Sequence, residues 1–125
     1  MRPACLALLA LLAALPAQAQ RSRCGFGLGL EGLRTADRML AEAAASSSLT
    51  AGREAAGAIA ARLHEVAGRL SGCGCHQAAD HAAEAAGLAD QAGNEAGIAR
   101  LRRSLDRARF SLTLARERLD RAGCS

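Results

Sequence analysis

Three features of the sequence predict an all-α fold, an up-down four-helix bundle of two helical hairpins stapled by two disulfides at one end. Apolar residues recur at alternating spacings of three and four in four successive segments, as they do in helices that pack side by side. Turn-forming residues separate these segments. Four of the five cysteines form two equally spaced pairs, Cys24 to Cys73 and Cys75 to Cys124. No segment shows the alternating pattern of a half-buried strand.

Residues 1–19 are expected to be a cleaved signal peptide. Arg2 precedes the apolar run Leu6 to Leu15, and Ala17-Gln18-Ala19 matches the small residues at a signal-peptidase site. The run is about half the roughly 20 residues that a membrane span requires. The chain is therefore expected to be exported, to the periplasm or the medium, with no transmembrane segment after cleavage.

Residues 20–125 are enough for one helical-bundle domain, and their apolar content is rich in alanine. They contain 25 Ala but only 19 Leu, Ile, Val, Met and Phe. Because alanine buries little area, such a core gains little from the hydrophobic effect. A small exported domain of this kind usually needs covalent support.

Each predicted helix carries one apolar face. The first face contains Leu33, Ala36, Leu40 and Ala43, and the second contains Ala56, Ile59, Leu63, Val66 and Leu70. The third consists of alanine alone, at Ala78, Ala82, Ala85, Ala89 and Ala92. The fourth combines Ile98, Leu105, Leu112 and Leu119 with Leu101, Ala108, Ala115 and Ala122.

Small and polar residues mark the breaks between these helices. Ser46 to Ser48 offer hydroxyl N-caps for the second helix, and glycines at 72 and 74 surround the central cysteines. Gly93-Asn94 is interpreted as a C-terminal glycine followed by the N-cap of the fourth helix. The glycine-rich residues 25–29 are interpreted as a flexible lead.

The topology brings all four cysteines of the domain to one end, because short connections make consecutive helices antiparallel. The equal spacing favours Cys24–Cys73 with Cys75–Cys124, one bridge for each hairpin (about 24–73 and 75–124). The crossed pairing, Cys24–Cys75 with Cys73–Cys124, remains open. Joining Cys73 to Cys75 would close a tight, strained ring and leave Cys24 to reach Cys124.

The run Cys73-Gly74-Cys75-His76 supports a competing hypothesis of metal binding or thiol redox chemistry. Thiolates with imidazole suit Zn²⁺ or Cu⁺, and a cysteine at a helix N-terminus can have a lowered pKa. Against this, an exported protein meets an oxidising compartment. His81 is five residues from His76, about 140° away around a helix, and His64 lies opposite the apolar face of the second helix, so all three are interpreted as surface histidines.

No catalytic or cofactor pattern is recognised, so the chain is expected not to be an enzyme. Asp80, His81 and Glu84 are interpreted as a solvated helix face. Covalent haem attachment requires Cys-x-x-Cys-His, and here the two cysteines stand one residue too close. Nucleic acid is not an expected partner, because export removes it and stacking aromatics are lacking.

The fourth helix carries the candidate interaction surface. Residues 95–121 have a net charge of +4, whereas residues 20–94 have −1. Opposite the apolar face lie Phe110 and Leu114, one turn apart, with Arg103, Arg107 and Arg118 beside them. Apolar anchors beside cations suit a protein partner or an anionic envelope surface. The expected role is therefore non-catalytic binding or structure, through this face.

Overall fold

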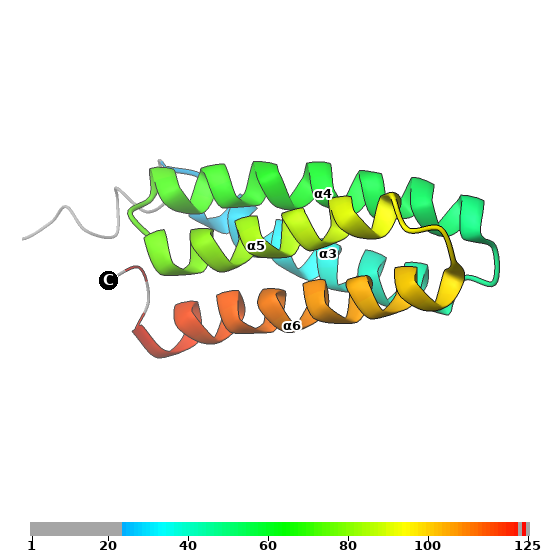
Figure 1. The fold of residues 1–125 in the computed structure, drawn as a ribbon. Helices are drawn as coiled ribbons and strands as arrows, with labels where there is room; N and C mark the ends of the chain where they lie inside the picture. Colours follow the sequence, from blue (N-terminus) through cyan, green and yellow to red (C-terminus); the bar gives the residue numbers. More distant parts are fainter. Residues whose placement is uncertain (1–23, 123, 125) are drawn as a thin grey trace, which may run out of the picture.

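The computed structural model describes residues 24–122 and Cys124. The signal-peptide prediction for residues 1–19 lies outside this range. With the labels of Figure 1, the helices are α3 (Phe26–Ala45), α4 (Leu49–Gly72), α5 (His76–Gly93) and α6 (Ile98–Ala122). They form an up-down bundle, and the disulfides Cys24–Cys73 and Cys75–Cys124 join its helices at one end, which confirms the predicted fold class. Within the described range, no helix has the length and apolar character that a membrane crossing would need.

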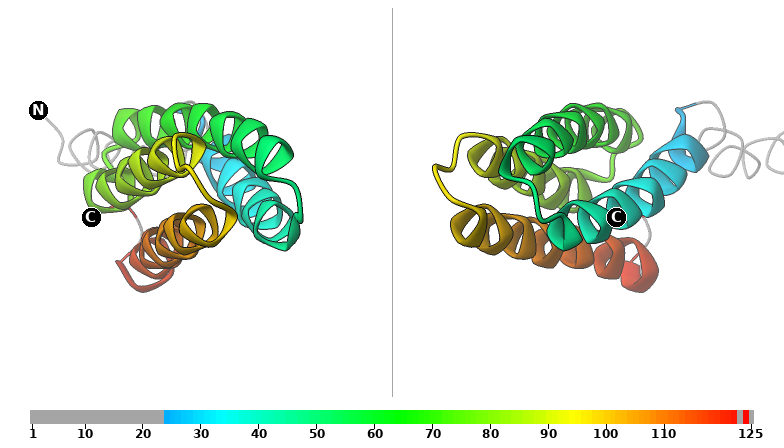
Figure 2. Two further views of the ribbon diagram at one scale, coloured as in Figure 1. Left: turned by 45° about the vertical axis from the view of Figure 1, so that its right-hand side comes forward. Right: turned by 90° about the vertical axis from the view of Figure 1, so that its right-hand side faces the viewer.

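The helices are arranged in a ring in which α4 packs on α3 and α5, and α6 packs on α5 and α3. The most extensive packing joins α5 to α4 and to α6. Helix α3 lies behind the other helices in Figure 1 and crosses them at an angle, as Figure 2 also shows.

The predicted apolar faces form the core. Every residue predicted for the faces of α3, α4 and α5 is buried. On α6 the predicted residues from Leu101 to Leu119 are buried, whereas Ile98 at the start of the helix is only partly buried. The 3–4 spacing therefore predicted correctly which face of each helix points toward the core.

Helix α5 is buried more widely than its predicted face, because it packs extensively on both α4 and α6. Ala79 and Ala86 are also buried, beside the predicted alanines. Alanine side chains allow the backbones of packed helices to approach closely, and this explains why α5 makes the most extensive contacts of the bundle.

Residues 25–29 are not a flexible lead, as the sequence had suggested, because α3 already begins at Phe26. Gly25 adopts φ of +80° directly before the helix, a conformation that favours glycine. Gly29 is buried against the side chain of Leu70 on α4. Packing against α4 and the disulfide at Cys24 thus outweigh the low helix propensity of these glycines.

The helix boundaries agree with the predicted turns except at Asn94. Ser48 caps α4, since its hydroxyl oxygen accepts a hydrogen bond of 3.2 Å from the backbone N–H of Ala51. Asn94 caps the end of α5 instead of the start of α6: its side-chain amide donates to the carbonyl oxygen of Asp90 at 2.9 Å. The N-cap prediction was wrong because α6 begins four residues later, at Ile98.

Candidate interaction surface

Seven of the eight arginines of α6 divide into two groups that lie on different flanks of the helix, and the eighth, Arg121, pairs with Glu117 of the same helix. Arg102, Arg109 and Arg116 are seven residues apart, so they share a flank, and all three make contacts beyond α6. Arg109 Nε lies 3.2 Å from Asp37 Oδ1 on α3, and an Nη1 atom of Arg116 lies 3.8 Å from Asp37 Oδ2. Arg102 donates a 2.9 Å hydrogen bond to the carbonyl oxygen of Ser46. These cations hold α6 against α3 and the α3–α4 connection.

The second group has no such partners. Among the described residues, Arg100, Arg103, Arg107 and Arg118 are exposed and form neither a hydrogen bond nor an ion pair. Three of them are the arginines that the sequence had placed on the candidate surface. Arg100 was missed, although it continues their stripe one turn toward the start of the helix.

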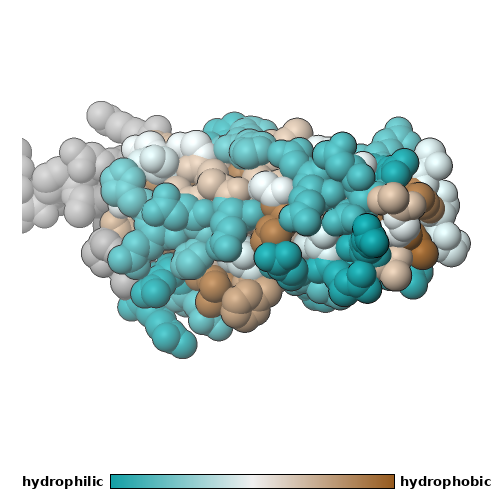
Figure 3. Space-filling view, in the orientation of Figure 1, coloured by the Kyte–Doolittle hydropathy of each residue, from teal (hydrophilic) through white to brown (hydrophobic). Residues whose placement is uncertain are grey.

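Two apolar side chains extend this stripe. Phe110 is 64% exposed, and Leu114, one turn further along, is partly buried. The stripe therefore runs along α6 at 3–4 spacing, from Arg100, Arg103 and Arg107 to Phe110, Leu114 and Arg118. In Figure 3, where α5 and α6 face the viewer, apolar areas interrupt an otherwise hydrophilic surface on and beside α6.

Two hollows lie where this stripe meets α5. One has a volume of about 420 Å³ and is lined by Glu84 and Leu88 of α5 and by Asp106, Arg107, Phe110 and Ser111 of α6. The other, of about 250 Å³, is lined by Gln91 and Glu95 on one side and by Arg100, Arg103, Ser104 and Arg107 on the other. Arg107 belongs to both, so the hollows adjoin along the α5–α6 seam.

Small residues of α6 explain the hollows. Ser104 and Ser111 are buried, although sequence patterning did not include them in the core, and each lines one hollow. Leu88 was also missed, because the alanine face of α5 gave no reason to single out one leucine beside it. Leu88 lines the same hollow as Phe110 because of the way α5 packs against α6, and the pattern of residues within one helix does not reveal that packing.

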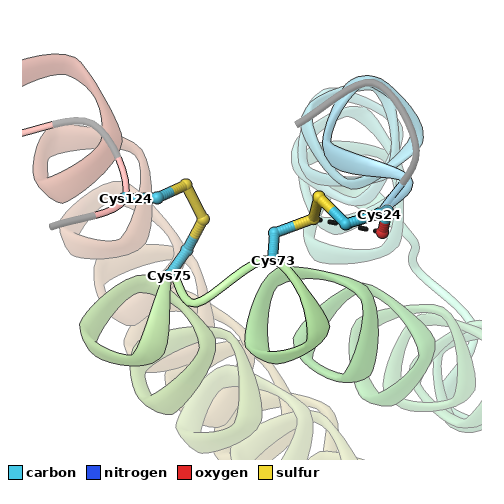
Figure 4. The surroundings of a disulfide bond; sticks show 4 residues. All are labelled: Cys24, Cys73, Cys75 and Cys124. Atoms are coloured by element: carbon cyan, nitrogen blue, oxygen red, sulfur yellow. Dashed lines mark hydrogen bonds between the residues drawn. A yellow bond between two sulfur atoms is a disulfide. The ribbon is translucent and has the colours of Figure 1, made fainter. Parts of the chain in front are cut away.

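The four cysteines lie together at the opposite end of the bundle from the α3–α4 and α5–α6 connections (Figure 4). The Cα atoms are 5.2 Å apart in Cys24–Cys73 and 4.1 Å apart in Cys75–Cys124. Cys73 Sγ also lies 3.1 Å from the carbonyl oxygen of Cys24, and Figure 4 marks this contact. A disulfide sulfur carries no proton, so this contact is close packing and not a hydrogen bond.

The residues of the metal or redox hypothesis, Cys73, Cys75 and His76, are not assembled as a thiolate site in this form. Each of the two sulfurs is bonded to a cysteine of another segment, and the His76 side chain is exposed. Within residues 24–122 and Cys124, no three His, Cys, Asp or Glu side chains are grouped as a metal would require.

Two histidines singled out in the sequence, His64 and His81, each lie beside a carboxylate. His64 Nε2 lies 3.3 Å from Asp90 Oδ2, which links α4 to α5, and His81 Nδ1 lies 3.7 Å from Glu84 Oε2 within α5. Arg69 donates a hydrogen bond of 2.7 Å to Glu65 on α4, and this bond, together with the charge of Arg69, lowers the pKa of the Glu65 carboxyl. Glu65 does not line either hollow.

Fold and surface together define a class: a small, disulfide-linked helical bundle with a basic and apolar stripe on one helix. Beyond that class, no family model, no curated protein and no solved structure matches the chain.

Proposed function

We propose that this chain is an exported, non-enzymatic protein that binds a partner through the outer face of α6. The observation that carries the proposal is the contrast between the two groups of arginines. Arg102, Arg109 and Arg116 serve the fold through contacts with α3 and its following turn. The stripe from Arg100 to Arg118 makes no such contribution within the described residues, yet it places unpaired cations beside an exposed aromatic ring.

Physical chemistry supports binding by such a stripe. Arginine and aromatic residues are enriched where protein interfaces gain most of their binding energy. Unpaired cations speed the encounter with an acidic partner, an effect that salt weakens. Export, to the periplasm or the medium, is supported by the two disulfides and by the signal-like residues 1–19.

Site-specific photo-crosslinking tests the proposal. A photoreactive residue is placed at position 110 of the native protein, and matched chains carry it at position 28, where Leu28 on α3 is 62% exposed. Position 110 is expected to give a discrete adduct in the exported fraction of the producing cells, and position 28 is not. Equal labelling at the two positions, or no adduct at either, would contradict a specific partner face on α6.

A double substitution provides the quantitative test. Phe110→Ser with Leu114→Ser is expected to reduce partner capture strongly. Because Phe110 is exposed, its own replacement should change the free energy of unfolding by about 0.5 kcal/mol or less. Leu114 is partly buried, so Phe110→Ser alone serves as the variant with the least effect on folding. Undiminished capture by both variants would remove the two residues from the proposal.

A further inference from the structure

The two hollows of the α5–α6 seam form one trough whose two ends differ in chemistry. Arg107 lines both hollows, and Ser104 and Ser111 line one each. These serines are seven residues apart on α6, which corresponds to about 10 Å along the helix. The trough is therefore long enough to contact several consecutive residues of another chain.

The end near the α5–α6 connection is basic. Arg100 and Arg103 line it together with Arg107, and Glu95 is the acidic residue of this hollow. The Glu95 carboxylate makes no ion pair with these arginines; its Oε1 accepts hydrogen bonds of 3.4 Å from Ser104 Oγ and from the Gln91 amide. Its backbone carbonyl oxygen in turn accepts from Arg53 of α4. Glu95 is thus held by its neighbours, and the hollow keeps an excess of positive charge, because three arginines line it with one carboxylate.

The end near the middle of the helices combines apolar side chains with two carboxylates and a single cation, Arg107. Leu88 and Phe110 face the same hollow from α5 and α6. The carboxylates of Glu84 and Asp106 line this hollow as well. An apolar side chain can bury itself between Leu88 and Phe110, but a further anionic group placed here would be repelled.

From this polarity we infer that the trough binds a short segment of a partner protein with carboxylates at one end and a large apolar side chain at the other. The carboxylates lie over Arg100 and Arg103, where bidentate guanidinium contacts can form. The apolar side chain lies about 10 Å away, between Leu88 and Phe110. This inference rests on the proposed function and specifies the partner of the same face.

A uniformly anionic surface fits the trough less well. A membrane of acidic lipids would meet Glu84 and Asp106 as well as the arginines, and among the described residues of the stripe only Phe110 and Leu114 could insert into it. Helices that bind bilayers usually bury a broad apolar face. The charge pattern therefore favours a peptide segment over a bilayer.

A selection from a displayed library of random twelve-residue peptides tests this inference on the oxidised, full-length protein. Enriched peptides are expected to combine neighbouring Asp or Glu residues with one Leu, Phe or Met. The spacing should span about 10 Å, three residues in an extended peptide or seven in a helical one. No enrichment, or enriched peptides that lack the acidic residues, would overturn the inference.

Matched variants locate the binding. The double substitution Arg100→Gln with Arg103→Gln is expected to weaken the binding of a selected peptide by about tenfold or more. Arg34→Gln with Arg62→Gln removes the same charge from α3 and α4 and should change its affinity by less than about twofold. Phe110→Ser is paired in the same way with Leu28→Ser, since both side chains are similarly exposed. Equal losses in test and control variants would show that the peptide does not use the trough.

Vesicles of phosphatidylglycerol and phosphatidylcholine separate this inference from the proposed function. The native protein is expected to bind them no better than Phe110→Ser does. Vesicle binding that requires Phe110, without any selected peptide, would overturn the peptide inference and leave the α6 face as the binding surface. If the crosslink at position 110 also fails, the proposed function falls with it.

Discussion

At the scale of single residues, the close approach of α3 to α4 depends on Gly32, which has no side chain. Gly32 is buried, and a Cβ atom placed on it would collide with the Cγ2 methyl group of Val66. Val66 is itself buried, and its branched side chain has little freedom to rotate away. The intrinsic preference of helices for alanine over glycine is therefore reversed at this position.

Gly32→Ala is accordingly expected to lower the free energy of unfolding by about 1–3 kcal/mol, the usual cost of overpacking a core. Gly57→Ala on α4 is the matched control, because nothing lies within 4 Å of its Cβ position. That substitution should raise stability by about 0.5–1 kcal/mol through helix propensity alone. Urea unfolding of both variants measures the difference. Stabilisation by Gly32→Ala would show that α3 and α4 do not meet as closely as described.

At the scale of the helices, α6 is attached to α3 by one carboxylate of α3 that pairs with two arginines two turns apart on α6. Asp37 reaches both Arg109 and Arg116, and its side chain is 27% exposed. Partial burial makes this pair less screened than a fully exposed one, although solvent still weakens it. The Arg34–Glu31 pair within α3 is far more exposed and joins no second helix.

Asp37→Asn is expected to lower the free energy of unfolding by up to about 1 kcal/mol, because two cations lose their shared partner. The loss should be smaller at high salt, which screens the interaction in the native protein. Glu31→Gln removes the same charge and should have a smaller effect. Thermal unfolding at low and high salt distinguishes the two variants. Identical responses would mean that the Asp37 bridge contributes nothing to the attachment of α6.

The helices also show what the sequence could predict and what it could not. The 3–4 spacing identified the buried faces of all four helices, because amphipathicity is a local property of each segment. It missed the helical start of α3, where packing of Gly29 against Leu70 decides the conformation. The stripe on α6 was recognised through Phe110 and Leu114. The division of the arginines was not, because it depends on where Asp37 of a distant helix lies.

At the scale of the whole molecule, each disulfide closes one helical hairpin of the bundle. Both bridges join residues 49 positions apart, Cys24 with Cys73 and Cys75 with Cys124. In the chain-entropy model, closing a loop of this size contributes about 4 kcal/mol. The net free energy of unfolding of a small domain is roughly 5–15 kcal/mol, so each bridge contributes a large share of it in a bundle with an alanine-rich core.

Replacing Cys24 and Cys73 together by Ser is therefore expected to lower the free energy of unfolding by about 4 kcal/mol, and replacing Cys75 and Cys124 by a similar amount. Circular dichroism with urea checks both variants, and non-reducing peptide mapping of the native protein provides the reference for the pairing. An unchanged unfolding midpoint in either double variant would show that the corresponding bridge does not restrain the unfolded chain.

The pairing also gives the molecule an unusual response to tension. A force applied to the segments before Cys24 and after Cys124 is carried from Cys24 to Cys73, through Gly74 to Cys75, and on to Cys124, entirely along covalent bonds. The four helices lie outside this load path, so pulling should leave them folded. In single-molecule stretching, the oxidised protein is expected to show no unfolding step, whereas reduction should release up to roughly 160–175 Å of chain from each loop. While both disulfides are intact, the bundle therefore bears none of the load, and its α6 face stays folded even when the two ends of the chain are pulled apart.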